Sequence, residues 1–241
     1  MSILPVPPLD HEFQGSASGT SGRPRPFLRQ FCRRVSVGLL LLTAVGCSRP
    51  TDSQRFERLV GWVRDGRSDT IDATRTPGVT DSDLAAAADL PGLRHLILDD
   101  CAVSDTGLAR LGSLPDLESL SLSGTRVTDT GLEHLTGAPR LRLLRLDRTP
   151  VTDAGLVPVG RLRELRTLSL WRTRVTGRGL GHLAGLPQLC LLSLDETGVT
   201  GSDLGLLRGM PSLRYLSVWR TAVSAADARG LGADPRLHVN Y

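Results

Sequence analysis

Lysine is absent from the 241-residue sequence, in which all 29 basic residues are arginine. Its absence excludes the phosphate-binding loop G-x-x-x-x-G-K-[ST], because that loop needs a lysine beside the phosphates. The zinc-binding pattern H-E-x-x-H and the paired cysteines of C-x-x-C are missing as well. We therefore expect a protein that is not an enzyme and that has neither a metal nor a cofactor.

A strongly basic body is also missing, although the formal net charge is +4. Residues 1–46 contain five arginines and two acidic residues, which leaves 24 arginines and 23 acidic residues in the rest of the chain. A nucleic-acid-binding protein needs a basic face. The near-neutral body therefore speaks against nucleic acid as a partner.

The sequence has no apolar run long enough to cross a bilayer. Its longest run, residues 35–45, would span roughly 16 Å as a helix, whereas a bilayer core is about 30 Å thick. Arg29, Arg33 and Arg34 precede the run, which is the pattern of a secretory signal. We expect residues 1–26 to be a disordered extension and residues 27–47 to be a signal peptide.

The apolar run ends in Ala44-Val45-Gly46-Cys47, which resembles the lipobox of bacterial lipoproteins. Ala44 departs from that family, which usually has leucine at this place. The resemblance implies secretion across the inner membrane and a lipid anchor on Cys47, on the periplasmic side or the surface of the cell envelope. Three other interpretations stay open: an ordinary cleaved signal, a short membrane anchor, or a cytoplasmic protein whose leader is not a signal.

A repeat of 24 residues dominates the remainder, with six full units over residues 90–233 and a truncated unit over residues 234–241. Each unit follows LPxLxxLxLxxTxVTDxGLxxLxG, which is similar to the leucine-rich repeats of the cysteine-containing, ribonuclease-inhibitor-like type. This repeat type is named after a cysteine at one position of the unit. That position holds Thr125 in the second unit and Cys101 in the first. The resemblance implies an α/β solenoid, a curved right-handed stack with a parallel sheet on the concave face and short helices on the convex face.

The second unit shows what each position of the repeat contributes. Leu120 and Leu122 alternate on a short strand, and therefore share one face. Thr128 suits a helix N-cap, and Asp129 places a negative charge at the positive end of the helix dipole. Gly131 lets the helix approach its neighbour closely. A single unit cannot bury its apolar side, so stability must be cooperative along the stack.

The two ends of the stack would expose apolar side chains to water and therefore need capping segments. Residues 48–89 are expected to form a linker, an N-terminal capping helix and a degenerate repeat, because residues 53–65 place apolar side chains at i, i+3, i+4 and i+7. In the truncated unit, Asn240 aligns with a core leucine, which indicates a minimal C-terminal cap. Cys101 and Cys190 lie four strands apart, on the order of 19 Å, and should stay free thiols.

Binding residues are expected between the core leucines, where side chains point away from the core and differ from unit to unit. Aromatic residues make up only 4% of the chain, yet Trp171 and Trp219 occupy equivalent positions two units apart, roughly 10 Å from each other. Tryptophan, tyrosine and arginine are enriched at binding hot spots. The predicted partner-binding residues are Trp171, Trp219, Tyr215, Asp195, Arg172, Arg220, Arg145 and Asp147.

The sequence thus favours a monomeric, non-catalytic module of the cell envelope that binds a protein of unknown identity through its concave face. Two alternatives stay open. The chain could be a structural envelope protein whose tryptophans only cover the sheet. If the leader is not a signal, it could instead be an intracellular adaptor of the F-box-associated kind.

Overall fold

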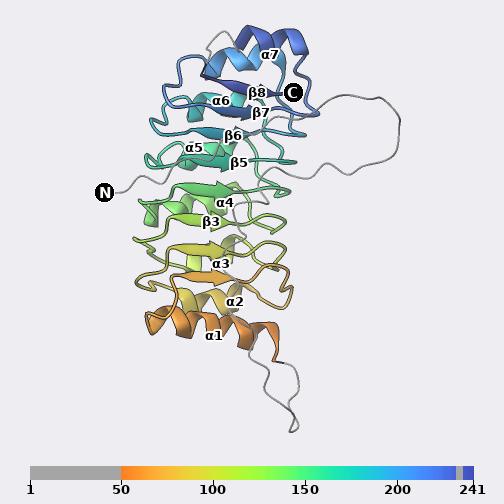
Figure 1. Ribbon diagram of the computed structural model, residues 1–241. Coiled ribbons are helices and arrows are strands. Elements are labelled where there is room, and N and C mark those ends of the chain that lie inside the picture. Colours follow the sequence, from red (N-terminus) through yellow and green to blue (C-terminus); the bar gives the residue numbers. More distant parts are fainter. Residues whose placement is uncertain (1–49, 232–235) are drawn as a thin grey trace, which may run out of the picture. The chain divides into compact units, whose positions relative to one another are not determined.

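The computed structural model describes residues 50–231 and 236–241, so the predicted extension, signal peptide and lipidated Cys47 lie outside the described residues. The described residues contain one parallel sheet whose eight strands follow each other in sequence order (Figure 1). The strands are β1 (Thr70–Asp72), β2 (His95–Ile97), β3 (Ser119–Ser121), β4 (Leu143–Arg145), β5 (Thr167–Ser169), β6 (Leu191–Ser193), β7 (Tyr215–Ser217) and β8 (His238–Asn240).

Short helical segments connect each strand to the next and lie together on one side of the sheet (Figure 1). The α-helices are α1 (Asp52–Arg64), α2 (Asp81–Leu84), α3 (Asp105–Arg110), α4 (Asp129–Leu132), α5 (Leu156–Val159), α6 (Gly177–Leu183) and α7 (Ala225–Leu231), and the 3-10 helices are η2 (Ala85–Ala87), η3 (Glu133–Gly137), η4 (Asp153–Gly155) and η5 (Gly201–Leu207). None of the helices described is long and apolar enough to cross a membrane. This strand–helix stack is the solenoid that the repeat predicts.

The core follows the leucine pattern of the repeat. The central strand leucine is buried in every full unit, and Leu120 and Leu122 of the second unit are 1% and 0% exposed. The helix predicted over residues 53–65 is α1, which begins with a capping box between Thr51 and Gln54. It buries Phe56 and Val60 and packs against the degenerate repeat at β1, α2 and η2. Burial of one apolar face per unit therefore accounts for the sheet and its N-terminal cover.

The strand register corrects the alignment of the last unit. Neighbouring strands from β2 to β7 pair at a spacing of 24 residues, such as Leu120 with Leu144. The last pair joins Leu216 to Val239, because the connection to β8 is one residue shorter than the others. Val239, which is partly buried against the core, therefore takes the place that the sequence alignment gave to Asn240.

Aspartates at the start of the helices join consecutive units. The carboxylate of Asp129 accepts hydrogen bonds from the backbone nitrogen of Thr152 at 2.7 Å and from its Oγ1 at 2.6 Å. Asp105 holds Thr128 in the same way. A Cβ on Gly131 would lie 2.4 Å from Asp105 Oδ1, so this glycine leaves room for that carboxylate. The close approach predicted at Gly131 is confirmed, and Asp129 has a linking role between units beyond the helix dipole.

Candidate functional site

The candidate site lies on the strand face, defined here as the side chains of the eight strands and the three residues after each strand that point away from the core. The residues that lie two positions beyond each strand form one row on this face. Aspartate alternates with another side chain along the row, so that aspartate recurs every 48 residues. From β2 to β7 this row consists of Asp99, Ser123, Asp147, Trp171, Asp195 and Trp219.

The aspartates of this row hold the next strand in place. Asp195 Oδ1 accepts hydrogen bonds from Ser217 Oγ at 2.6 Å and from the backbone nitrogen of Trp219 at 2.7 Å. Asp147, which is only 5% exposed, accepts from Ser169 Oγ and from the backbone nitrogen of Trp171. The expectation that the scaffold leaves these positions free is therefore wrong for both aspartates, because their carboxylates satisfy polar groups of the neighbouring unit.

Each of the two tryptophans carries an arginine over its ring. The guanidinium carbon of Arg172 lies 5.2 Å from the ring centroid of Trp171, and that of Arg220 lies 4.2 Å from the ring centroid of Trp219. Both distances are within the range of cation–π attraction. Arg172 and Arg220 have positive φ angles of 56° and 55° at the turn that follows the strand. The repeated turn therefore produces the same tryptophan–arginine pair twice, two units apart.

Glu196 connects the two pairs. Its carboxylate accepts hydrogen bonds from Arg172 Nε at 2.6 Å and from Trp171 Nε1 at 3.4 Å, and it lies 3.6 Å from a guanidinium nitrogen of Arg220. The hydrogen bond from Arg172 is the main reason that the pKa of Glu196 is below its ordinary value. Trp171, Arg172, Glu196, Trp219 and Arg220 are called the Trp–Arg cluster below.

The prediction from sequence did not include Glu196 among the binding residues. The sequence nevertheless contains a pattern that points to Glu196. Glu196 lies 24 residues after Arg172 and 24 before Arg220, so the three residues occupy equivalent positions of the repeat. An acidic residue between Arg172 and Arg220, in the row three residues beyond each strand, identifies the position.

The remaining predicted residues lie beside the cluster and not in it. Tyr215 stacks on His238 of β8, with ring centroids 5.5 Å apart. Arg145 forms ion pairs with Asp147 at 3.2 Å and with Asp99 at 3.8 Å, and its Nε has no hydrogen-bond partner. The structure therefore groups the tryptophans with Arg172 and Arg220, and places Arg145 and Asp147 in a separate ion-pair network.

Histidine and cysteine side chains are the next candidates for chemistry among the described residues. His134 and His182 are exposed on the helical side. Residues 50–231 and 236–241 contain no group of three or more histidine, cysteine or acidic side chains that could hold a metal. Cys101 and Cys190 are free, and burial raises the pKa of the Cys101 thiol, which favours its protonated and unreactive form.

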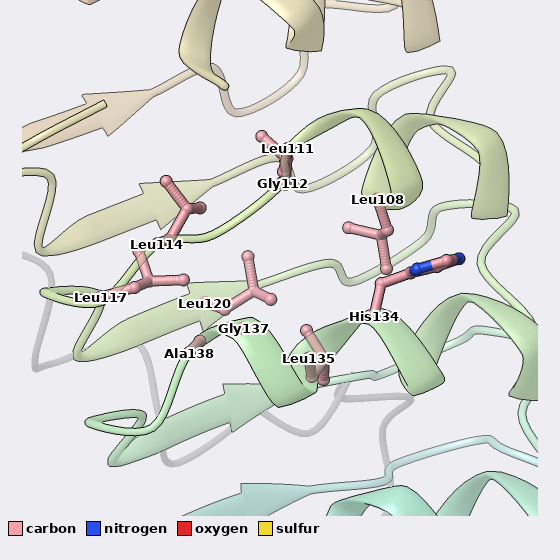
Figure 2. Close-up of a pocket in the computed structure, with 10 residues that line it drawn as sticks. All are labelled: Leu108, Leu111, Gly112, Leu114, Leu117, Leu120, His134, Leu135, Gly137 and Ala138. Atoms are coloured by element: carbon pink, nitrogen blue, oxygen red, sulfur yellow. The ribbon is translucent and has the colours of Figure 1, made fainter. Parts of the chain in front are cut away.

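A small cavity lies between the helical side and the strands of the first units (Figure 2). Its volume is about 20 Å³, which is room for about one water molecule, and six of its ten lining residues are leucine. Ala138 lines it at a position where four other units have leucine. The cavity is therefore a local packing defect and too small for a ligand.

Comparisons with known proteins agree with the architecture. Residues 113–135 match the family described as Leucine Rich repeat. Among curated proteins, none matches the chain. An internalin C2 of Listeria monocytogenes is similar in structure, with 24% sequence identity, a TM-score of 0.59, and coverage of 81% of this chain and 88% of that chain. An internalin (inlF) of the same organism has 18% identity and a TM-score of 0.46, and the match covers 80% of this chain and 65% of that chain.

The likeness to internalin C2 concerns the fold alone. The repeated sequence, the parallel sheet with one strand per unit and the family match all lead to the same class. The chain has the fold of a leucine-rich repeat solenoid.

Proposed function

We propose that the chain is a non-catalytic binding module whose protein partner contacts the strand face at the Trp–Arg cluster. The observation that carries the proposal is the pair of half-buried tryptophans, each with an arginine over its ring, at positions that the repeat motif does not fix. Solenoids offer extended surfaces for partners. Tryptophan and arginine are the residues that contribute most to such contacts.

Preorganisation of the cluster supports this role. Glu196 and Trp171 already restrain Arg172, so a partner would lose less free energy in ordering that side chain. A cation–π pair contributes about 0.5–1 kcal/mol when exposed and about 2 kcal/mol or more when desolvated. A partner that covers the cluster would therefore strengthen contacts that exist before binding.

The location belongs to the same proposal. The lipobox-like end of the leader supports lipidation of Cys47 and an envelope location, and the TxVTDxGL signature supports the ribonuclease-inhibitor-like subtype, with the chain acting as a monomer. Metabolic labelling with a fatty acid tests the anchor. Label on the wild type and none on Cys47→Ala is expected, whereas an unlabelled cytosolic protein would favour an intracellular adaptor.

The binding surface is tested by affinity capture from envelope extracts with the double variant Trp171→Ala/Trp219→Ala. We expect this variant to lose partners that the wild type retains, because it removes both rings. Trp62→Ala is the matched control, since Trp62 also lies under an arginine, Arg67 at 5.7 Å, but on α1. Thermal unfolding of each variant confirms that it is folded.

The opposite result would support a structural role. If the double variant captured the same proteins as the wild type, the tryptophans would only cover the sheet. One observation favours that second function: Trp171 Nε1 already has an acceptor within the chain, in Glu196.

A further inference from the structure

The near-neutral body conceals a separation of charge along the stack. Residues 50–137 contain eight arginines and 15 acidic residues, whereas residues 138–241 contain 15 arginines and eight acidic residues. The formal charges of these two halves are therefore −7 and +7. Because the strands follow sequence order, this difference in sequence is also a difference in space. The Trp–Arg cluster lies in the basic half.

The surface of the basic half is more positive than its formal charge indicates, because its arginines are exposed and most of its acidic residues are not. Thirteen of its fifteen arginines are exposed, whereas Asp227 is the only exposed acidic residue among those described in this half. Most of its aspartates have carboxylates in hydrogen bonds of the scaffold, as Asp153 does with Thr176 and Asp195 does with Ser217. A partner approaching this half therefore meets guanidinium groups.

Several of these arginines have only neutral contacts. Arg163 and Arg208 donate to the backbone oxygens of Gly185 and Gly230, and Arg166 donates to the amide oxygen of Gln188. All three lie in the turns that lead from a helix to the next strand. Their charge is not compensated by a carboxylate of the described residues.

Within the cluster, Arg220 is the side chain best placed to receive a carboxylate. Arg172 and Arg220 share Glu196, but only Arg172 is hydrogen-bonded to it. The Arg220 side chain is 59% exposed, lies 3.6 Å from Glu196 and makes no hydrogen bond within the described part of the chain. Its guanidinium donors are therefore free to bind an incoming oxygen beside the half-buried ring of Trp219.

We propose that the partner of the strand face is an acidic polypeptide segment, with a carboxylate on Arg220 and an apolar side chain against Trp219. This inference rests on the proposed function and names the chemistry of its partner. A polypeptide supplies both groups in one ligand. A guanidinium already occupies one face of each indole, which disfavours base stacking and hence a single-stranded nucleic acid.

A second copy of the chain fits less well. Its acidic half would be the complementary surface, but all eight arginines of that half are exposed, while most of its aspartates and glutamates are partly buried. Two of them, Asp116 and Glu118, are already paired with Arg140 and Arg142. The acidic half therefore presents a mixed surface.

The test measures tryptophan fluorescence of the full chain while poly-L-glutamate is added as the probe. The chain carries Trp62→Phe, so that only Trp171 and Trp219 contribute to the emission. We expect the probe to change tryptophan emission with a Kd that rises with salt, because exposed charges are screened. Arg220→Glu should raise that Kd about tenfold. Arg75→Glu is the matched control, because Arg75 has the same positive-φ turn position after β1, in the degenerate repeat, and is also exposed. It should change the Kd less than about twofold.

Four results would overturn the proposal: no change of emission with poly-L-glutamate, an equal loss for Arg75→Glu, a stronger response to phosphatidylglycerol vesicles, or a stronger response to a DNA duplex. Salt-sensitive self-association of the chain alone, measured by sedimentation velocity, would instead make a second copy the occupant. Failure here remains distinct from failure of the proposed function. Poly-L-glutamate could fail to bind while the tryptophan double variant still loses a captured partner. That result would support the proposed binding surface and contradict the proposal that its partner is acidic.

Discussion

A single carboxylate, that of Glu196, is shared by two arginines on the strand face. Because the hydrogen bond from Arg172 holds the pKa of Glu196 below its ordinary value, the ionised form is stabilised in the folded state. The unfolded pKa is about 4.3. The resulting stabilisation is fully present above that value and is lost as the pH falls through the lower, folded pKa.

Glu196→Gln should therefore lower the free energy of unfolding at neutral pH by about 0.5–1 kcal/mol, the range for partly exposed ion pairs. The loss should shrink at a pH below the folded pKa, where wild-type Glu196 is itself protonated. Urea unfolding at a series of pH values from 7 into the acid range measures both effects. Glu133→Gln is the control, since Glu133 is exposed on η3 and has no ion pair with another described residue. Equal losses for both variants would contradict the assigned role of Glu196.

Individual residues also show how far the sequence can predict the structure. Alternation identifies Leu120 and Leu122 as core, because burial follows directly from local geometry. The roles of Asp147 and Asp195 were not predictable from a single unit. Their hydrogen-bond partners lie 22 and 24 residues later, on the next strand, and recur only every second unit. The repeat must be compared over 48 residues to detect them.

Among the elements, the connection from η3 to β4 begins at a packing defect. Ala138 begins the third unit, where the first, second, fourth and fifth units have leucine and the sixth has Met210. The cavity of about 20 Å³ that it lines also contacts leucines of two units (Figure 2). Small voids of this kind reduce stability because the lining atoms lose van der Waals contacts.

Ala138→Leu should fill this cavity and raise the free energy of unfolding by about 1 kcal/mol, a typical gain for cavity filling. The reverse change one unit later is the matched control. Leu162→Ala should create an equivalent void and cost about 2–5 kcal/mol. Urea unfolding compares the three proteins. A loss of stability in Ala138→Leu would mean that the third unit has adjusted to alanine and is overpacked by leucine.

Over the whole molecule, stability depends on the two ends as well as on the units between them. At the N-terminal end, α1 covers the degenerate repeat with Phe56, Val60 and Val63, all at most 4% exposed. The C-terminal end has only α7 and the short strand β8, where Leu237 and Val239 remain partly buried. In a stack whose units contact only their neighbours, a loose end opens more readily than a covered one.

Phe56→Ala should therefore cost about 3–5 kcal/mol, because it empties a fully buried aromatic position in the N-terminal cap. Leu237→Ala should cost only about 1 kcal/mol, because a partly buried leucine loses less apolar contact and its end of the stack is already less covered. Urea unfolding gives both values, and hydrogen exchange locates them. If α1 is the effective cap, Phe56→Ala will speed exchange in β1 and β2 while leaving β6 and β7 protected. Equal costs for the two substitutions would show that the stack is held as firmly by β8 as by the helix.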